Sequence, residues 1–359
     1  METCGNIMES GRIKEKECRC QKQKSGIKQG KDKEMEKKLE GLYELQYRSY
    51  LRGDEEAKAK ASEDTARAAM EIAVPDGMEI TEQRIPGYTG EKSLPSLPKL
   101  SKGKGLLVRI YRPAAEKPLP VILDIHGGGW VAGNLDTDFG RCIEIARRVP
   151  AVVVAIEYTL SDGKSRHYPA PLYDCIGAYL WMAEHAAEFG GDPGKLGING
   201  NSAGGNLAAG LSLWLRDHVG PKCALTVLNC PVLYLDYPET HAFHQNYELR
   251  MGPDNYGLNS ELAFLGGHDG GATLPPYYAF PGHCPDLRGL NPHCIIAAEY
   301  DTLRDDAVRY MERLLKVGVP VDFLLVSHVC HCFSRMPGEW TDHVHDTIAL
   351  AFRREFGWC

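Results

Sequence analysis

Two short glycine-rich runs contain the residue types that a serine hydrolase needs. Ser202 is the central residue of the run GNSAG over residues 200–204, which fits the pattern G-x-S-x-G of a nucleophile held on a sharp turn between a strand and a helix. About 75 residues upstream, residues 126–130 read HGGGW and directly follow an apolar run. A loop of this kind presents backbone N–H groups to a developing oxyanion. Either run alone is short enough to arise by chance, so it is their combination that indicates a serine hydrolase.

The residues after Ser202 predict how an oxyanion would be bound. They are small, beginning with Ala203, and they predict a helix that starts at the nucleophile and directs the positive end of its dipole toward it. The expected oxyanion donors are the backbone N–H groups of Gly128, Gly129 and Ala203. His126, at the start of the loop, is expected to be structural rather than catalytic.

A serine at its ordinary pKa also needs a base, and the base needs a carboxylate that orients it, in the chain order Ser, then Asp or Glu, then His. Catalytic groups belong at the carboxyl ends of parallel strands. Asp301 directly follows the apolar run 294–300, and His331 follows the run 321–327 after a short loop. These two residues are therefore the candidates for acid and base, and His328 is the nearest alternative to His331.

The pattern of apolar residues predicts an α/β fold with a mainly parallel central sheet flanked by helices. From residue 119 onward, short apolar runs alternate with helical stretches, as in βαβ units. Strands are expected at residues 78–86, 105–111, 119–125, 151–156, 196–199, 224–229, 292–299 and 321–327. Helices are expected at residues 139–148, 171–189, 203–215, 305–317 and 338–356. Asp305 and Asp306 are expected to cap the helix that they begin.

Segments outside this alternation are expected to form a tail and a cap. Residues 1–34 are mostly charged and polar, so we expect a disordered tail. Residues 35–75 show helical periodicity and are expected to form the N-terminal helices of a cap. The catalytic domain is expected to span residues 76–359. Within it, residues 235–288 are too long for a plain loop and are predicted to be a cap insertion over the site.

Composition narrows the classes of function. A chain of 359 residues with 43% hydrophobic residues can bury a large core, and a net charge of −7 offers no basic surface for nucleic acid. No segment approaches the roughly 18 apolar residues of a membrane helix, and no secretory signal is recognisable. We therefore expect a cytoplasmic protein whose partner is a small-molecule ester, with no nucleic acid and no membrane bound. A homodimer is compatible with this interpretation.

The cysteines are expected to be reduced thiols. There are twelve of them, but a chain of this length needs no disulfides for stability and shows no secretory signal. Cys330 and Cys332 flank His331, yet their spacing is unlike that of zinc ligands and a fourth ligand is missing. No metal and no cofactor are therefore expected. Joint oxidation of these two thiols would distort the loop that carries His331, which gives a hypothesis of redox inactivation.

Together these motifs resemble the hormone-sensitive-lipase family of α/β-hydrolases, which includes many bacterial short-chain carboxylesterases. The resemblance runs from about residue 107 to the C-terminus. It rests on the oxyanion run 126–130, the nucleophile run 200–205 and the run EYDTLRD over residues 299–305. It implies the α/β-hydrolase fold and a catalytic role for Asp301.

The same resemblance distinguishes the two histidines. Residues 321–333 align without a gap on the final strand and His-Gly-Phe loop of the family, which implies His331 rather than His328. The chain departs from the family at Asn201, where Asp or Thr is usual, and at Cys332, which replaces Gly. A longer polar turn over residues 159–167 also changes the rim of the expected site.

The sequence thus predicts a serine carboxylesterase for small, short-acyl esters, acting through an acyl-enzyme. In this interpretation Ser202 attacks, His331 is the base and Asp301 holds the imidazolium. An amidase or peptidase on the same three residues is an alternative that the motifs leave open. A non-catalytic ligand-binding member of the fold is a second alternative, which the retention of His331 disfavours.

Overall fold

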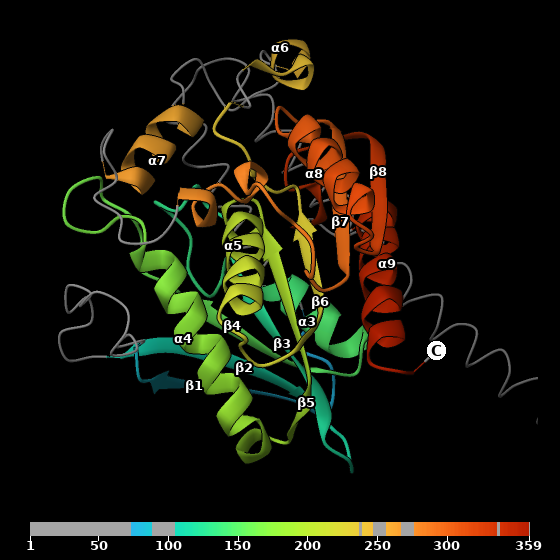
Figure 1. The fold of residues 1–359 in the computed structure, drawn as a ribbon. Helices are drawn as coiled ribbons and strands as arrows, with labels where there is room; N and C mark the ends of the chain where they lie inside the picture. The colour runs from blue at the N-terminus through green and yellow to red at the C-terminus, as the bar shows by residue number, and fades with distance from the viewer. Residues whose placement is uncertain are drawn as a thin grey trace, which may run out of the picture.

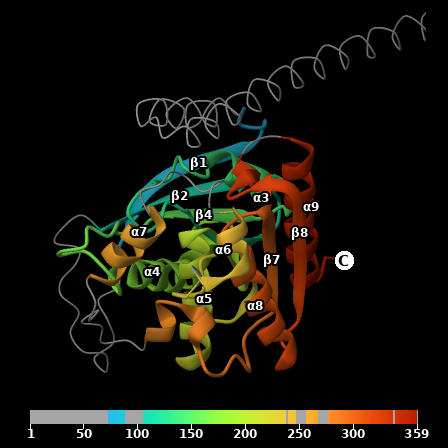
Figure 2. The same cartoon turned by 90° about the horizontal axis from the view of Figure 1, so that it is seen from above.

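The fold is a single mixed sheet with helices on both faces (Figures 1 and 2). The computed structural model describes residues 73–87, 105–236, 239–246, 256–266, 276–335 and 338–358. Its eight strands lie in the order β1-β2-β4-β3-β5-β6-β7-β8. They are β1 (Met78–Ile85), β2 (Leu106–Pro113), β3 (Leu119–Ile125), β4 (Val152–Glu157), β5 (Gly191–Asn201), β6 (Cys223–Asn229), β7 (His293–Tyr300) and β8 (Val321–Cys330).

The sheet is antiparallel at one edge and parallel elsewhere. β1 pairs antiparallel with β2, and β2 pairs antiparallel with β4. All pairs from β4 to β8 are parallel, so the carboxyl ends of these strands meet at one edge of the sheet. The predicted α/β fold with a mainly parallel sheet is confirmed. Residues of β3 are buried on both faces, which explains its continuous apolar sequence.

Two apolar cores cover the two faces of the sheet. Helices α4, α5 and α8 pack on one face, and α3 and α9 pack on the other. Figure 2 shows α8 and α9 on opposite sides of β7 and β8. These helices are α3 (Phe139–Arg148), α4 (Ala170–His185), α5 (Ala203–Asp217), α8 (Arg304–Lys316) and α9 (Glu339–Glu355). Each helix lies within a few residues of its predicted range.

Two strands are longer than their sequences indicated. β8 continues through the polar residues Ser327 and His328 to Cys330, so His331 follows the strand directly and not after a loop. The pairing shifts from Ala298 opposite Val326 to Tyr300 opposite Cys330, which places extra residues on β8 as a bulge. β5 likewise begins before its apolar core, at Gly191.

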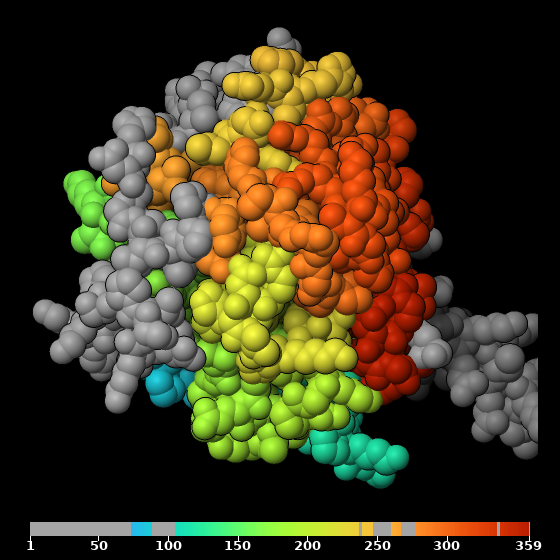
Figure 3. All heavy atoms as spheres, in the orientation of Figure 1, coloured from blue at the N-terminus to red at the C-terminus, as the bar shows by residue number. Residues whose placement is uncertain are grey.

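The segment predicted as a cap insertion contains short helices. They are α6 (His241–Asn246), α7 (Tyr256–Leu265), η4 (Pro276–Tyr278) and η5 (Pro281–His283). Figure 1 shows α6 at the end of the molecule above α5 and α7 lower and to one side, and Figure 3 shows the same face with all heavy atoms. The predicted tail and N-terminal cap helices, up to residue 72, lie outside the described residues. The domain boundaries therefore stay predictions. Within the part of the chain that the structure covers, no helix is long and apolar enough to cross a membrane.

The interpretation of Asp305 and Asp306 as helix caps is wrong. The N-cap residue of α8 is Leu303, and no side chain caps this helix. Asp305 Oδ2 instead accepts a hydrogen bond from the backbone N of Ala242 at 2.8 Å, in α6. Asp306 Oδ2 accepts from the backbone N of Leu233 at 2.8 Å and from that of Tyr234 at 3.0 Å. Both carboxylates thus tie the segment after β6 to α8, and sequence spacing carries no signal for such long-range partners.

Candidate active site

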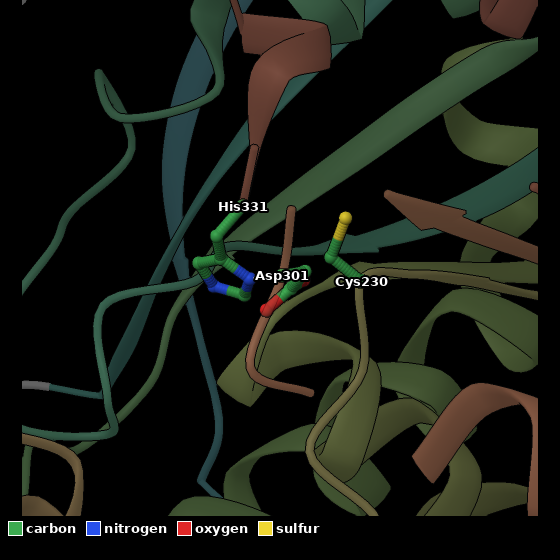
Figure 4. Close-up of side chains that lie close together, drawn as sticks. All are labelled: Cys230, Asp301 and His331. Carbon is green, nitrogen blue, oxygen red and sulfur yellow. Dashed lines mark hydrogen bonds and ion pairs between the residues drawn. The ribbon is translucent and has the colours of Figure 1, made fainter. Parts of the chain in front are cut away.

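Three residues that directly follow strands of the parallel part of the sheet form a hydrogen-bonded chain. Ser202 follows β5, Asp301 follows β7 and His331 follows β8. The Ser202 hydroxyl lies 2.8 Å from His331 Nε2, and His331 Nδ1 lies 2.7 Å from Asp301 Oδ2. Figure 4 shows the imidazole of His331 beside the Asp301 carboxylate. A nucleophile, a base and an orienting carboxylate joined in this order can perform acyl transfer.

The backbone at Ser202 has the strained conformation of a nucleophile turn. Its φ is 57° and its ψ is −119°, which L-residues seldom adopt. The backbone N of Ser202 donates to Asn229 O at 2.8 Å, at the end of β6, and its carbonyl accepts from Asn206 N at 3.0 Å in the first turn of α5. These contacts hold the hydroxyl at the exposed end of the strand.

Close packing around the turn explains its glycines. A Cβ at Gly204 would lie 2.0 Å from the carbonyl oxygen of Ile125, so any side chain there would push α5 away from β3. A Cβ at Gly127 would lie 2.7 Å from Asn201 O and 3.1 Å from the Cβ of Ser202. The glycine loop after β3 therefore runs directly against the nucleophile, as the predicted oxyanion role requires.

The three expected oxyanion donors belong to the segments that meet at Ser202. Gly128 and Gly129 lie in a turn in which the backbone N of Ala132 donates to Gly128 O at 2.9 Å. Ala203 is the first residue of α5, where backbone N–H groups have no acceptor within the helix. The N-terminus of α5 also favours negative charge at this point. The assignment of these three groups to the oxyanion stays a prediction.

The buried side chain of Asn206 joins the oxyanion loop, α5 and the segment around η4. Its Oδ1 accepts from Trp130 Nε1 at 3.2 Å. Its Nδ2 donates to Val232 O at 2.9 Å and to Ala279 O at 2.8 Å. The sequence analysis missed this residue. An amide one helical turn after the nucleophile, within an otherwise apolar helix, was the signal that could have found it.

His126 lies in the core beneath the loop. Its ring stacks on Tyr158 with centroids 4.3 Å apart, and its Nδ1 lies 2.9 Å from the carbonyl oxygen of Gly127. Burial lowers the pKa of His126 to about 4, so the ring is neutral at physiological pH. These contacts fit the expected structural role.

His331 is the most exposed member of the chain of three. Its side chain is 26% exposed, whereas that of Asp301 is 2% exposed. Asp301 Oδ1 accepts from the backbone N of Leu303 at 2.9 Å, which fixes the carboxylate. Burial lowers the pKa of His331, but the charge of Asp301 and the hydrogen bond to it prevail, so the pKa is raised well above its ordinary value.

The alternative base, His328, has a different place. It is exposed on the bulge of β8, and its backbone N donates to Glu299 Oε2 at 2.8 Å. Its ring lies edge-on to that of Tyr300. The structure therefore joins His331, and not His328, to Ser202 and Asp301.

A buried network of charges supports the loop after His331. Arg335 Nε donates to Asp138 Oδ1 at 3.0 Å, and Arg141 Nη2 bridges Asp138 and Asp124, at 3.0 Å from an oxygen of each. With its amide oxygen facing Arg335, Asn201 accepts from Arg335 Nε at 3.0 Å. The sequence analysis noted Asn201 as a departure from the family but did not find this network.

The eight cysteines that the structure describes have free side chains, and their redox state stays a prediction. These eight residues form no disulfide, and six of them are buried. Cys332 has a left-handed backbone with φ 59°, which accounts for the glycine that the family has here. Burial raises the pKa of Cys332, but the charges of His331 and Arg335 outweigh it and leave that pKa lowered.

Comparison with known proteins agrees with this geometry. Residues 122–335 match a family described as the alpha/beta hydrolase fold, a span that holds the oxyanion loop and the three hydrogen-bonded residues. The chain belongs to this family. The resemblance to hormone-sensitive-lipase-like esterases is thereby confirmed, and the chain is a carboxylic ester hydrolase.

Relatives and solved structures of this hydrolase family cover most of the chain. It is 33% identical to esterase LipI of Mycobacterium tuberculosis over 261 residues, which cover 70% of this chain and 79% of LipI. It is 46% identical to versiconal hemiacetal acetate esterase of Dothistroma septosporum over 233 residues, 60% of this chain and 67% of that one. An esterase of Pyrobaculum calidifontis superposes with a TM-score of 0.71 at 27% identity, covering 82% of this chain and 92% of the other.

Proposed function

We propose that this esterase hydrolyses short-acyl carboxylic esters through an acyl-enzyme formed on Ser202. The observation that carries the proposal is the continuous hydrogen-bonded chain from Ser202 Oγ through His331 to Asp301, with contacts of 2.8 and 2.7 Å. The contact between hydroxyl and Nε2 argues against a non-catalytic ligand-binding protein, because it is the arrangement that activates a serine.

Acylation uses each of these groups in turn. Ser202 Oγ attacks the carbonyl carbon while His331 Nε2 accepts its proton, and Asp301 stabilises the imidazolium. The backbone N–H groups of Gly128, Gly129 and Ala203 stabilise the negative oxygen, each contributing about 3 kcal/mol to the transition state. The imidazolium then donates its proton to the leaving alcohol, which leaves the acyl group on the serine.

Deacylation repeats the sequence with water as the nucleophile. His331 Nε2 accepts a proton from water as the water oxygen attacks the acyl carbon, and the same amides stabilise the second tetrahedral intermediate. Proton transfer from the imidazolium to Ser202 Oγ releases the carboxylic acid. No cofactor takes part in either half-reaction.

Two observations support a short acyl group. Trp130, next to the oxyanion loop, is buried in an aromatic cluster, stacked on Phe264 with centroids 4.4 Å apart and edge-on to Phe280 at 6.2 Å. Phe264 and Phe280 belong to the segment predicted as a cap insertion, so the rings of this segment pack directly against the residue that ends the HGGGW run. In addition, the relative at 46% identity carries the name of an acetate ester esterase.

A series of p-nitrophenyl esters from acetate to laurate tests the proposal. We expect kcat/KM to be highest for acetate or butyrate, and activity to be lost in Ser202→Ala and His331→Ala. A maximum at long chains would refute the short-acyl assignment, and an active Ser202→Ala enzyme would refute the mechanism. Turnover of p-nitroanilides but not esters would indicate an amidase.

A further inference from the structure

Three metal-ligating side chains meet beside the imidazole of His331. Figure 4 shows Cys230, Asp301 and His331, which directly follow β6, β7 and β8. The sulfur of Cys230, a carboxylate oxygen of Asp301 and a ring nitrogen of His331 all lie within 4.8 Å of one another. Among the described residues no other group of three or more Cys, His, Asp and Glu side chains comes this close.

The types of the three ligand atoms and their separations are close to those of a zinc site. Thiolate, imidazole and carboxylate are the ligands that Zn²⁺ prefers, and neighbouring ligand atoms of a tetrahedral zinc lie roughly 3.3–3.7 Å apart, from bond lengths of about 2.0–2.3 Å. The 2.7 Å contact between His331 Nδ1 and Asp301 has to widen slightly. The group of three spans up to 4.8 Å, so its ligand atoms also have to draw closer together when the ion binds.

The position of Cys230 is held by its backbone. Its N donates to Ile296 O at 2.8 Å, and its sulfur lies within 4.8 Å of a ring nitrogen of His331. The residue is 2% exposed, whereas the His331 side chain is 26% exposed, so the ring borders the solvent side of the group. Water can therefore occupy a fourth coordination position, as in zinc sites with three protein ligands.

We propose that Cys230, Asp301 and His331 form a zinc site whose occupation inhibits the esterase. The ion binds the Cys230 sulfur, an Asp301 oxygen and His331 Nδ1. The thiol of Cys230 releases its proton to solvent and binds as thiolate. The metal displaces the proton of His331 Nδ1 to solvent, and Nε2 takes up a proton from solvent, so the metal-bound ring stays neutral and carries its proton on Nε2.

This change of tautomer removes the base. His331 Nε2 accepts the Ser202 proton only when it is unprotonated, so a ring held with its proton on Nε2 cannot activate the serine. The metal does not cover Ser202 or the oxyanion loop, so the ester still binds. Zinc therefore lowers kcat and leaves KM unchanged. Inhibition rests on the proposed role of His331, whereas metal binding does not.

A cysteine comparison tests the site. Cys230→Ser removes one ligand, and Cys332→Ser is the matched control, because Cys332 directly follows His331 in the chain but its thiol is not one of the three ligands. Each variant is compared with its own activity in EDTA, and Mg²⁺, a hard cation, serves as the control ion. We expect zinc to inhibit the unchanged chain and Cys332→Ser alike, reversibly by EDTA. Cys230→Ser is expected to need about 100-fold more zinc.

Cobalt provides a readout that is independent of activity. Co²⁺ bound to a thiolate gives a charge-transfer absorption in the near ultraviolet, which we expect in the unchanged chain and in Cys332→Ser but not in Cys230→Ser or Cys230→Ala. Equal zinc sensitivity of the Cys230 variants and the unchanged chain would overturn the proposal, as would a rise in KM with unchanged kcat. Loss of the band in Cys332→Ser alone would place the metal on that thiol instead. A cobalt band in a chain without esterase activity would contradict the proposed function but not the site.

Discussion

At the scale of single residues, the proposed chemistry depends on the protonation of one imidazole. His331 accepts a proton only when it is neutral, and the Asp301 carboxylate, 2.7 Å from Nδ1, raises the pKa of the imidazole well above its ordinary value. In the proposed mechanism the same carboxylate then stabilises the imidazolium formed during the reaction. The raised pKa makes His331 a stronger base, but it also means that the imidazole is protonated, and cannot accept a proton, over a wider range of acidic pH.

The pH profile of kcat/KM tests this coupling. Activity is lost as pH falls through the pKa of His331, so we expect the acid limb above the ordinary histidine value of about 6.5. Asp301→Asn removes the largest contribution that raises the pKa of His331, so this pKa is expected to fall. The acid side of the pH profile of kcat/KM is expected to move to lower pH, and kcat is expected to fall about 10⁴-fold.

Asp305→Asn is the control for that experiment. Asp305 lies in the same motif, but its carboxylate binds the backbone N of Ala242 and not His331. We expect it to leave the acid limb in place. An Asp301→Asn enzyme with an unchanged limb and rate would show that Asp301 is not the partner of the base.

At the scale of elements, the oxyanion loop depends on a helix far away in the sequence. Trp130 stacks on Phe264 of α7 at an interplanar angle of 10°, and Phe264 is fully buried. The backbone N of Tyr168 also donates to Phe264 O at 2.6 Å. Helix α7 therefore packs on the residue that ends the HGGGW run, and its position bears on the amides of that run.

Phe264→Ala tests whether this packing positions the oxyanion loop. Removal of a buried ring costs about 3–5 kcal/mol of stability, and a displacement of about 1 Å in a catalytic group lowers the rate about 100-fold. We expect kcat to fall more than KM rises, measured in protein shown to be folded by circular dichroism. Phe264→Leu, which retains apolar volume, is expected to recover part of kcat. A change confined to KM would indicate a wall of the substrate pocket and no positioning role.

The elements that pack locally could be predicted, and those set by distant partners could not. The apolar pattern predicted β3 and α3 at their observed bounds. In both, the order of apolar and polar residues over a short stretch of sequence indicates which side chains are buried. The extension of β8 to Cys330 depends on backbone pairing with Tyr300, which the polar pair Ser327-His328 conceals.

The residues of the candidate site also fall into those that the sequence predicted and those that it did not. Ser202, Asp301 and His331 follow apolar strands or carry recognisable motifs, so they could be predicted. Asn206 and the Arg335 network could not, because their partners lie far apart in the sequence.

At the scale of the whole molecule, the parallel sheet brings the site together and buried charges fix its surroundings. Arg141 is 1% exposed at its side chain and lies between the carboxylates of Asp124 and Asp138. Asp138 also binds Arg335, four residues after His331. The network therefore links the end of β3, helix α3 and the loop that carries His331.

Arg141→Met is expected to destabilise the fold strongly. It leaves the buried Asp124 without a cationic partner, and loss of one partner from a buried ion pair costs about 3–5 kcal/mol. Arg147→Met, on the same helix, breaks a pair whose arginine is 49% exposed, and the expected loss is about 0–1 kcal/mol. Urea unfolding at neutral pH measures both. Equal midpoints for the two variants would show that the buried network adds nothing to stability.

The most direct test of the central claim, nucleophilic catalysis by Ser202, is covalent labelling with diethyl p-nitrophenyl phosphate followed by peptide mass spectrometry. We predict release of p-nitrophenol in proportion to the activity lost, a diethylphosphoryl group on the peptide that contains Ser202, and no label in Ser202→Ala. A label on a different residue that accompanies the loss of activity, or full inactivation with Ser202 unmodified, would contradict the account.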